Sequence, residues 1–236
     1  MKIIILSITQ YKEKDGIVDA ISEEGPISFQ VKGLFGSKGK FASLNNAMTI
    51  ADIELSQGKS KYPTLKAFEL IQTPMKEVTE LNYMGALMFL SEITRKGLQD
   101  DEKAMLFKHL YAALLQLKTG NNPWWIVLVY TANVLKATGA EFEVDHCMIC
   151  GKRKGITTFS FEEGGFICKD CFQPDMERPF NTNQMLLIRA AFRAVDYAHV
   201  DENCTQENAL VVLTRLREYI NDYLGISIES LKFLNN

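Results

Sequence analysis

Two Cys-x-x-Cys pairs constrain this chain more than any other feature of its sequence. The first pair is Cys147 and Cys150, and the second, after seventeen intervening residues, is Cys168 and Cys171. Each pair can place two sulfur atoms on one tight turn, and this spacing lies within the pattern of structural zinc sites. A redox-active pair or four unrelated buried thiols are the alternatives. We predict one structural zinc ion bound by the four cysteines.

The predicted metal site is structural because four thiolates close the tetrahedral shell and leave no open position for a substrate. A zinc deaminase would also need a glutamate two residues after a histidine. His109, His146 and His199 are each followed at that position by another residue, and no H-E-x-x-H motif is present. His146 adjoins Cys147 and is an alternative ligand, although the four cysteines already suffice.

The first 73 residues have the pattern of short β-strands. Apolar and β-branched runs are separated by turn dipeptides such as Asp15-Gly16 and Gly25-Pro26. The expected strands are residues 2–11, 17–22, 27–32, 49–55 and 62–71. Five short strands in so few residues predict a small barrel or sandwich.

From residue 74 onward the apolar residues recur with helical spacing. The expected helices are residues 78–97, 100–120, 123–138, 183–198 and 205–224. The third is apolar nearly all round and is predicted to be the buried centre of a bundle. Between the third and fourth helices lies the cysteine-bearing segment, where residues 157–161 and 164–167 predict a hairpin between the two cysteine turns.

Lysines and aromatic residues alternate in the β segment. No acidic residue occurs from Pro26 to Asn46, and a second basic group surrounds Tyr62. Lysines beside exposed rings suit a single-strand groove, in which charge follows the phosphates and rings stack on bases. The candidate DNA contacts are Lys32, Phe35, Lys38, Lys40, Phe41, Lys59 and Lys61. The alternative is a solvated loop with its aromatics turned into the barrel, and the net charge of −3 argues against binding through overall charge.

Several functions are excluded by motif. Gly33 and Gly39-Lys40 are separated by five residues where a P-loop needs four, and Ile53 occupies the first glycine position ahead of Gly58-Lys59-Ser60. We therefore expect no nucleotide cofactor and no enzymatic activity. The apolar run 124–130 is too short for a membrane helix, and no secretory signal is apparent, so a cytoplasmic protein is expected.

The order of these parts resembles one family, the bacterial recombination mediator RecO. The resemblance lies in residues 138–151, which lead into the first cysteine pair, and in residues 159–171, which contain Gly164-Gly165 and the second pair. The closing segment, residues 224–234, also resembles the end of that family.

This resemblance implies an α+β protein with a five-stranded OB-fold barrel over residues 1–73. A helical bundle over residues 74–236 would carry a zinc ribbon inserted at about 141–180. It also implies a non-enzymatic, nucleoid-associated role: binding single- and double-stranded DNA, annealing complementary strands, and helping with RecR to load recombinase on strands coated by single-strand-binding protein. The alternative is a zinc-ribbon adaptor that binds protein and does not touch DNA.

Overall fold

The N-terminal strands close into a barrel. The computed structural model describes residues 1–36, 41–56, 61–74 and 81–234. The strands are β1 (Lys2–Tyr11), β2 (Asp15–Ser22), β3 (Gly25–Val31), β4 (Ile50–Ser56) and β5 (Thr64–Gln72), joined in the order β1-β2-β3-β5-β4. All neighbours are antiparallel except β3 and β5, which meet in parallel at Gln30 and Thr64. The predicted OB-like barrel is confirmed.

Both faces of the first strand are buried, which explains its run of isoleucines. Successive side chains of a strand point to opposite faces. Ile3 and Ile5 lie in the barrel interior with Phe29, whereas Ile4 and Leu6 join the core that the helices form. The outer wall of the barrel is therefore one of the surfaces against which the helical part packs.

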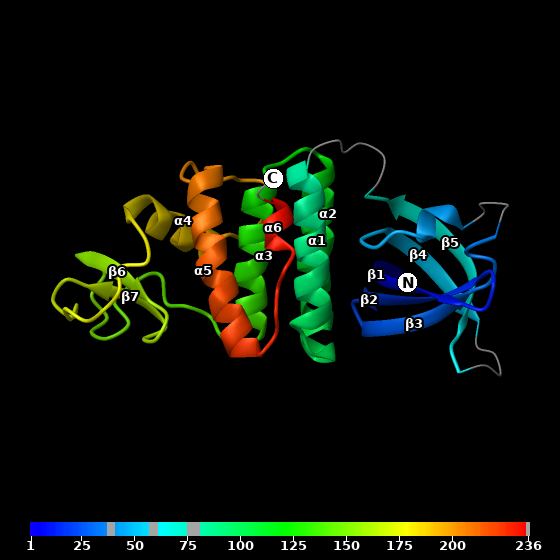
Figure 1. Cartoon of the computed structure of the whole chain (residues 1–236), viewed down its shortest axis with the longest axis horizontal. Coiled ribbons are helices and arrows are strands. Elements are labelled where there is room, and N and C mark those ends of the chain that lie inside the picture. Colours follow the sequence, from blue (N-terminus) through cyan, green and yellow to red (C-terminus); the bar gives the residue numbers. More distant parts are fainter. Residues whose placement is uncertain (37–40, 57–60, 75–80, 235–236) are drawn as a thin grey trace.

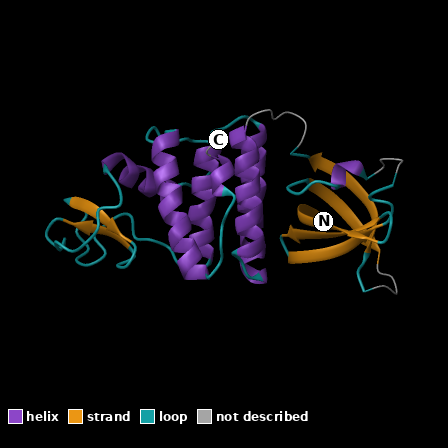
Figure 2. Ribbon diagram, in the orientation of Figure 1, coloured by secondary structure: helices purple, strands orange, loops and turns teal. Residues whose placement is uncertain are grey.

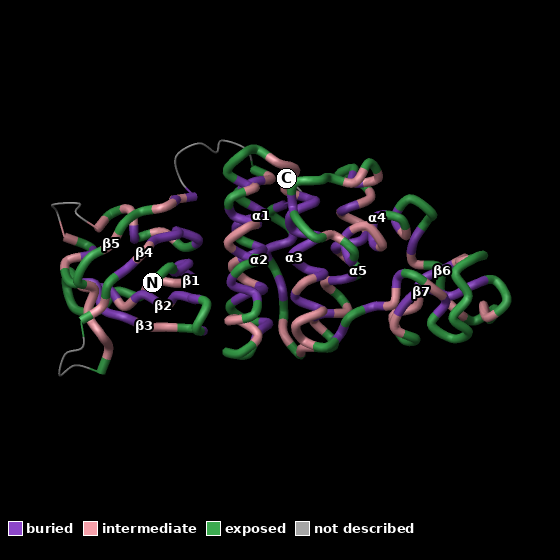
Figure 3. Tube along the Cα trace, turned by 180° about the vertical axis from the view of Figure 1, so that it is seen from behind, coloured by how far each residue is buried: buried purple, intermediate pink, exposed green. Residues whose placement is uncertain are grey.

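The helical part follows the sequence pattern closely. Its elements are α1 (Leu81–Lys96), α2 (Asp100–Lys118), α3 (Pro123–Ala137), α4 (Thr182–Arg193), α5 (Gln206–Leu224) and α6 (Leu231–Leu234). Helix α3 lies among the others and is buried at every position from Trp124 to Ala132 (Figure 3). It starts where Asn122 accepts hydrogen bonds from the amides of the two residues after Pro123.

Two features of the helical part differ from expectation. The helix expected to reach Ala198 ends at Arg193, and the Asp196 carboxylate accepts hydrogen bonds from the amides of Ala198 and His199 in the turn that follows. The short helix α6 was not expected. It packs on α1 at Gly85, where a Cβ atom would lie 2.5 Å from the backbone of Leu234.

The inserted segment forms a small two-stranded sheet, β6 (Ile156–Ser160) and β7 (Gly165–Cys168). Figure 1 shows this sheet at one end of an elongated molecule, the barrel at the other, and the helices between them. Figure 2 shows that the strands of the described residues lie in these two end parts. Strand β5 ends at Gln72 and α1 covers Leu81–Lys96, whereas the expected start of this helix at residue 78 lies outside the described residues. We propose the domain boundary at residues 73–74.

Candidate metal centre and nucleic-acid interface

The two cysteine pairs come together in three dimensions. The four sulfur atoms of Cys147, Cys150, Cys168 and Cys171 lie within 4.8 Å of one another, and none forms a disulfide. The Sγ atoms of Cys150 and Cys168 are 3.6 Å apart. A tetrahedral zinc site with Zn–S bonds of about 2.3 Å requires sulfur separations of about 3.8 Å. The donor set thus fits one metal ion bound by four thiolates.

Backbone turns position the sulfur atoms. The first pair is held by a turn in which the amide of Gly151 donates to the carbonyl of Cys147 at 2.8 Å, and Gly151 adopts a φ of 73°. This left-handed conformation suits glycine. The second pair begins at the end of β7, where the amides of Cys171 and Phe172 both donate to the carbonyl of Cys168, at 3.1 and 3.0 Å. Each turn places two sulfurs on the same side of the chain.

The electrostatics of the cluster favour a bound cation. Burial opposes ionisation of Cys147, but the amides of Cys168, Cys150 and Ile149 donate hydrogen bonds to its sulfur and lower the pKa of this thiol to about 6. The hydrogen bonds that Cys171 shares with Cys150 and the other sulfurs raise its own pKa, and a bound cation would favour its thiolate form.

His146 does not join the metal cluster. Its Nε2 atom lies 3.2 Å from Oε2 of Glu143, and the metal-binding group found among the described residues consists of the four cysteines. The alternative in which His146 replaces a thiolate therefore has no geometric support.

The candidate DNA contacts differ in how they are placed. Lys32 and Lys61 are exposed, and the Lys61 ammonium lies over the ring of Tyr62 at 5.3 Å. Phe35 is 37% exposed, whereas Phe41 is half-buried and tilts against Phe68, with ring centroids 5.9 Å apart. The remaining candidates, Lys38, Lys40 and Lys59, lie outside the described residues.

The turn between β1 and β2 adds residues that the sequence reasoning missed. The amide of Phe35 donates to the carbonyl of Lys14 at 2.9 Å, which holds this turn against the loop after β3. Tyr11 is 44% exposed, with the ammonium of Lys12 5.2 Å from its ring centroid. We call the resulting group the barrel edge cluster: Tyr11, Lys12, Lys14, Lys32 and Phe35. The signal was present as alternating lysines after Tyr11, but only the strand pairing shows that this turn meets the later loop.

The carboxylate of Asp15 helps to hold the barrel edge cluster together. It accepts one hydrogen bond from the amide of Gly33 at 2.9 Å and another from the side chain of Gln30 at 2.9 Å. The Asp15 carboxylate is therefore hydrogen-bonded to the backbone amide that directly follows Lys32. Three cationic side chains and two partly exposed rings share this end of the barrel, an arrangement suited to a single-stranded polyanion.

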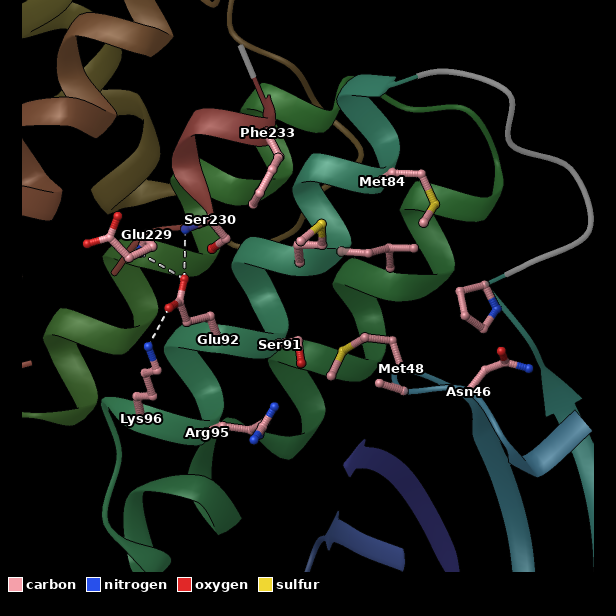
Figure 4. A pocket seen from close by; sticks show the side chains of 14 residues that line it. Asn46, Met48, Met84, Ser91, Glu92, Arg95, Lys96, Glu229, Ser230 and Phe233 are labelled. Carbon is pink, nitrogen blue, oxygen red and sulfur yellow. Dashed lines mark hydrogen bonds and ion pairs between the residues drawn. The ribbon is translucent and has the colours of Figure 1, made fainter. Parts of the chain in front are cut away.

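A groove lies between α1, the C-terminal segment and a loop of the barrel (Figure 4). It has a volume of about 440 Å³, and its apolar lining includes the partly exposed Met84, Met88 and Phe233. Glu92 accepts a hydrogen bond from Lys96 at 2.6 Å and two more from the backbone amides at residues 229 and 230, at 3.0 and 2.8 Å.

Arg95 supplies positive charge at the rim of this groove. Its side chain is exposed, and no ion pair joins it to any carboxylate of the described residues. Because Lys96 is already paired with Glu92, Arg95 is, among the described residues that line the groove, the cation available to a ligand.

Comparison with known proteins assigns both parts of the chain. The family described as Recombination protein O C terminal matches residues 78–232, and Recombination protein O N terminal matches residues 1–74. The chain belongs to the RecO family. Relatives named DNA repair protein RecO from Bacillus cereus (strain B4264) and Bacillus thuringiensis subsp. konkukian (strain 97-27) are each 30% identical over 239 residues. The match covers 98% of this chain and 94% of each relative.

No helix among the described residues is long and apolar enough to cross a membrane. The RecO relatives and this chain share nearly their full length, and this chain has the barrel, the helical part and the four-cysteine cluster that the resemblance led us to expect.

Proposed function

We propose that this RecO-family protein binds single- and double-stranded DNA and anneals complementary strands during DNA repair. In the same proposal it acts in the cytoplasm at the nucleoid and, with RecR, helps to load recombinase on strands coated by single-strand-binding protein. The observation that carries the proposal is the barrel edge cluster, which joins the lysine-bearing turn after β1 to the loop after β3.

The cluster offers the two contacts that a single strand needs. Lys12, Lys14 and Lys32 can neutralise phosphates, and the partly exposed rings of Tyr11 and Phe35 can stack on bases. Phosphate contacts release counterions, so binding by this surface must weaken as salt rises. Phe41, half-buried against Phe68, is less available for stacking than Phe35.

Annealing by this route needs binding energy alone. A protein that neutralises phosphates on two strands at once reduces their mutual repulsion and raises their effective concentration. No bond is made or broken, so the proposed activity is non-enzymatic and independent of ATP.

The four cysteines are proposed to hold one structural zinc ion. Cys147 and Cys150 precede β6, while Cys168 ends β7 and Cys171 follows it, so a bound ion would join both ends of the hairpin. Zinc supplies cross-linking here and no reaction chemistry, because four thiolates fill its coordination shell.

Recognition of single-strand-binding protein is proposed to use the groove beside α1. The tail typical of that protein is acidic and ends in apolar residues. The groove is complementary to such a tail. Met84, Met88 and Phe233 can contact the apolar end of the tail, and Arg95 at the rim can pair with one of its carboxylates.

The adaptor hypothesis is favoured by the same groove, because an exposed apolar surface on a chain of net charge −3 also suits a protein partner. The two hypotheses differ in DNA binding. An adaptor would show no salt-dependent affinity for a bare oligonucleotide.

The test is annealing of complementary oligonucleotides, bare or coated with single-strand-binding protein that is intact or lacks its last residues. We expect annealing without ATP, inhibition by salt, and a loss on strands coated by the truncated protein. The Arg95→Glu variant should lose annealing only on coated strands, and Lys108→Glu, at an exposed position of α2, is the control. Equal rates with intact and truncated coating protein would remove the tail contact, and no annealing on either substrate would favour the adaptor.

A further inference from the structure

The zinc-bearing segment separates its charges into two faces. Residues 141–180 contain eight acids and five bases, yet no acid occurs in the sixteen residues from His146 to Phe161. The acids Glu162, Glu163, Asp175 and Glu177 line a hollow at the tip of the hairpin. Four of the five bases lie instead around the cysteine turns, where Asp170 is the acid between Cys168 and Cys171. A segment that is acidic in total therefore presents one distinctly cationic surface.

We call this surface the knuckle face: Lys152, Arg153, Lys154, Lys169 and Arg189. The aliphatic carbons of Lys169 lie alongside Gly155, 3.6–3.7 Å from where its Cβ would be, which brings Lys169 next to the turn of Lys154. Arg153 and Arg189 line one hollow of about 190 Å³, together with Thr182 at the start of α4.

Most of these cations are uncompensated. Asp170 pairs with Lys152 at 2.8 Å, and the nearby charge of Lys169 also lowers the pKa of this carboxyl, whereas Arg153 and Lys154 are exposed and have no ion pair within the described residues. Arg189 donates to the carbonyl of Val144 at 2.7 Å and lies over the ring of Phe166, so no carboxylate neutralises it. Four thiolates around a divalent ion carry a net charge of about −2, Asp170 adds one negative charge, and the five cations of the knuckle face exceed this total.

The position of the knuckle face suggests its role. The cysteine turns lie at one end of the molecule and the barrel at the other, with the helices between (Figure 1). Annealing requires two strands, and the barrel edge cluster offers a surface for one. Arginine and lysine side chains on an exposed turn can follow a phosphate backbone, and the guanidinium fork pairs with phosphate oxygens.

We infer that the knuckle face is a second nucleic-acid contact, which holds the backbone of a second strand while the barrel holds the first. This inference rests on the proposed DNA binding by the barrel. It assigns to the zinc-bearing segment a direct part in annealing, through phosphate contacts that do not depend on base sequence.

The experiment counts strands per protein chain. Labelled, non-complementary oligonucleotides of about eight nucleotides are used, a length within the site of a single OB-fold. Native mass spectrometry gives the stoichiometry, and fluorescence anisotropy gives the affinity and its salt dependence. The test variant is Arg153→Glu with Lys154→Glu. The control is Lys108→Glu with Lys118→Glu, the same charge change at exposed positions of α2.

We expect the wild type and the control to bind two oligonucleotides, and the knuckle variant to bind one with unchanged first affinity. The second oligonucleotide bound by the wild type and by the control should show a salt slope of at least about 1.4, because each single-strand phosphate contact contributes about 0.7 and Arg153 and Lys154 supply two of them. Annealing by the knuckle variant should slow by roughly tenfold, the lower end of what electrostatic steering provides. Elemental analysis should find the same zinc content in both proteins, since neither changed residue is a ligand.

Other outcomes distinguish a failure of the knuckle face as a second contact from a failure of the proposed DNA binding as a whole. If the wild type binds a single oligonucleotide, or the knuckle variant still binds two, the knuckle face is not a second contact, although annealing by the barrel can stand. If the wild type binds no oligonucleotide, the proposed function itself fails and the inference falls with it.

Discussion

Replacing Gly85 with alanine should change the free energy of unfolding in two opposite ways, through the helix propensity of α1 and through a clash with α6. In an isolated helix the change would stabilise α1 by about 1 kcal/mol, because glycine is that much less favourable than alanine. In the folded protein the new Cβ would lie 2.5 Å from the backbone nitrogen and Cα of Leu234 and from the carbonyl oxygen of Phe233. These atoms belong to the main chain of α6 and cannot rotate away, so α6 must move.

The cost of moving α6 follows from what it buries. Leu231 is 3% exposed and Leu234 is fully buried. Full burial of a leucine contributes roughly 1.5–3 kcal/mol, so displacing both loses roughly 3–6 kcal/mol. After the gain in helix propensity, Gly85→Ala should lower the free energy of unfolding by about 2–5 kcal/mol. The groove should also bind an acidic, apolar peptide less well, because Phe233 forms part of its lining.

The assay is urea unfolding followed by the fluorescence of Trp124 and Trp125, which are buried in α3. A second pair of proteins, with and without the alanine, ends after Ser230 and so lacks α6. In that background the same change should stabilise the protein by about 1 kcal/mol, since the clash is gone. If alanine stabilises the full chain as well, the close approach of α6 to α1 is wrong.

Three further predictions concern the metal site, the barrel and the C-terminal segment. Cys168→Ser should reduce bound zinc below one ion per chain by elemental analysis and expose residues 141–180 to proteolysis, because metal binding and local folding are linked; a variant that retains full zinc would contradict the ligand assignment. Lys12→Glu with Lys14→Glu should flatten the salt dependence of single-strand binding by about 1.4, and an unchanged slope measured by anisotropy would move the DNA footprint off this turn. Burial acts to raise the pKa of Glu92, but the hydrogen bonds from Lys96 and Ser230 outweigh it, and the pKa lies below its usual 4.5. A lowered carboxyl pKa stabilises the fold above the unfolded-state value, and that contribution is lost as pH falls through the folded-state value. Glu92→Gln should therefore be less stable than the wild type at neutral pH and approach it below about pH 4.5 in urea titrations; a difference that does not change with pH would show that the charge of Glu92 is not involved.

Local pattern was enough to predict most of the fold. The alternation in the first 72 residues gave strands close to those observed, and helix ends marked by Pro123 and Gly225 fall where they were expected. The end of α4 was missed because Ala194 leaves the helical conformation and Asp196 then accepts hydrogen bonds from the amides of Ala198 and His199 in the turn, which apolar spacing does not reveal.

The DNA surface was only partly predictable, for a different reason. Lys32 and Phe35 were found because they occur in one acid-free stretch, whereas Lys12 and Lys14 belong to a turn about twenty residues earlier. Whether an aromatic ring is exposed depends on its neighbours in the fold. The sequence could not show that Phe41 packs against Phe68 while Phe35 stays partly exposed.

The sequence by itself determined the four-cysteine cluster. Each metal-binding turn depends on the spacing of two cysteines only three positions apart, and that spacing can be read directly from the sequence. Only the tertiary structure decided which distant cations act together. It joined the turn after β1 to the loop after β3, placed Lys169 beside Gly155, and brought α6 onto Gly85. Each of these contacts comes from strand register or from helix packing, and both arise from burying apolar surface across the whole chain, which no single segment specifies.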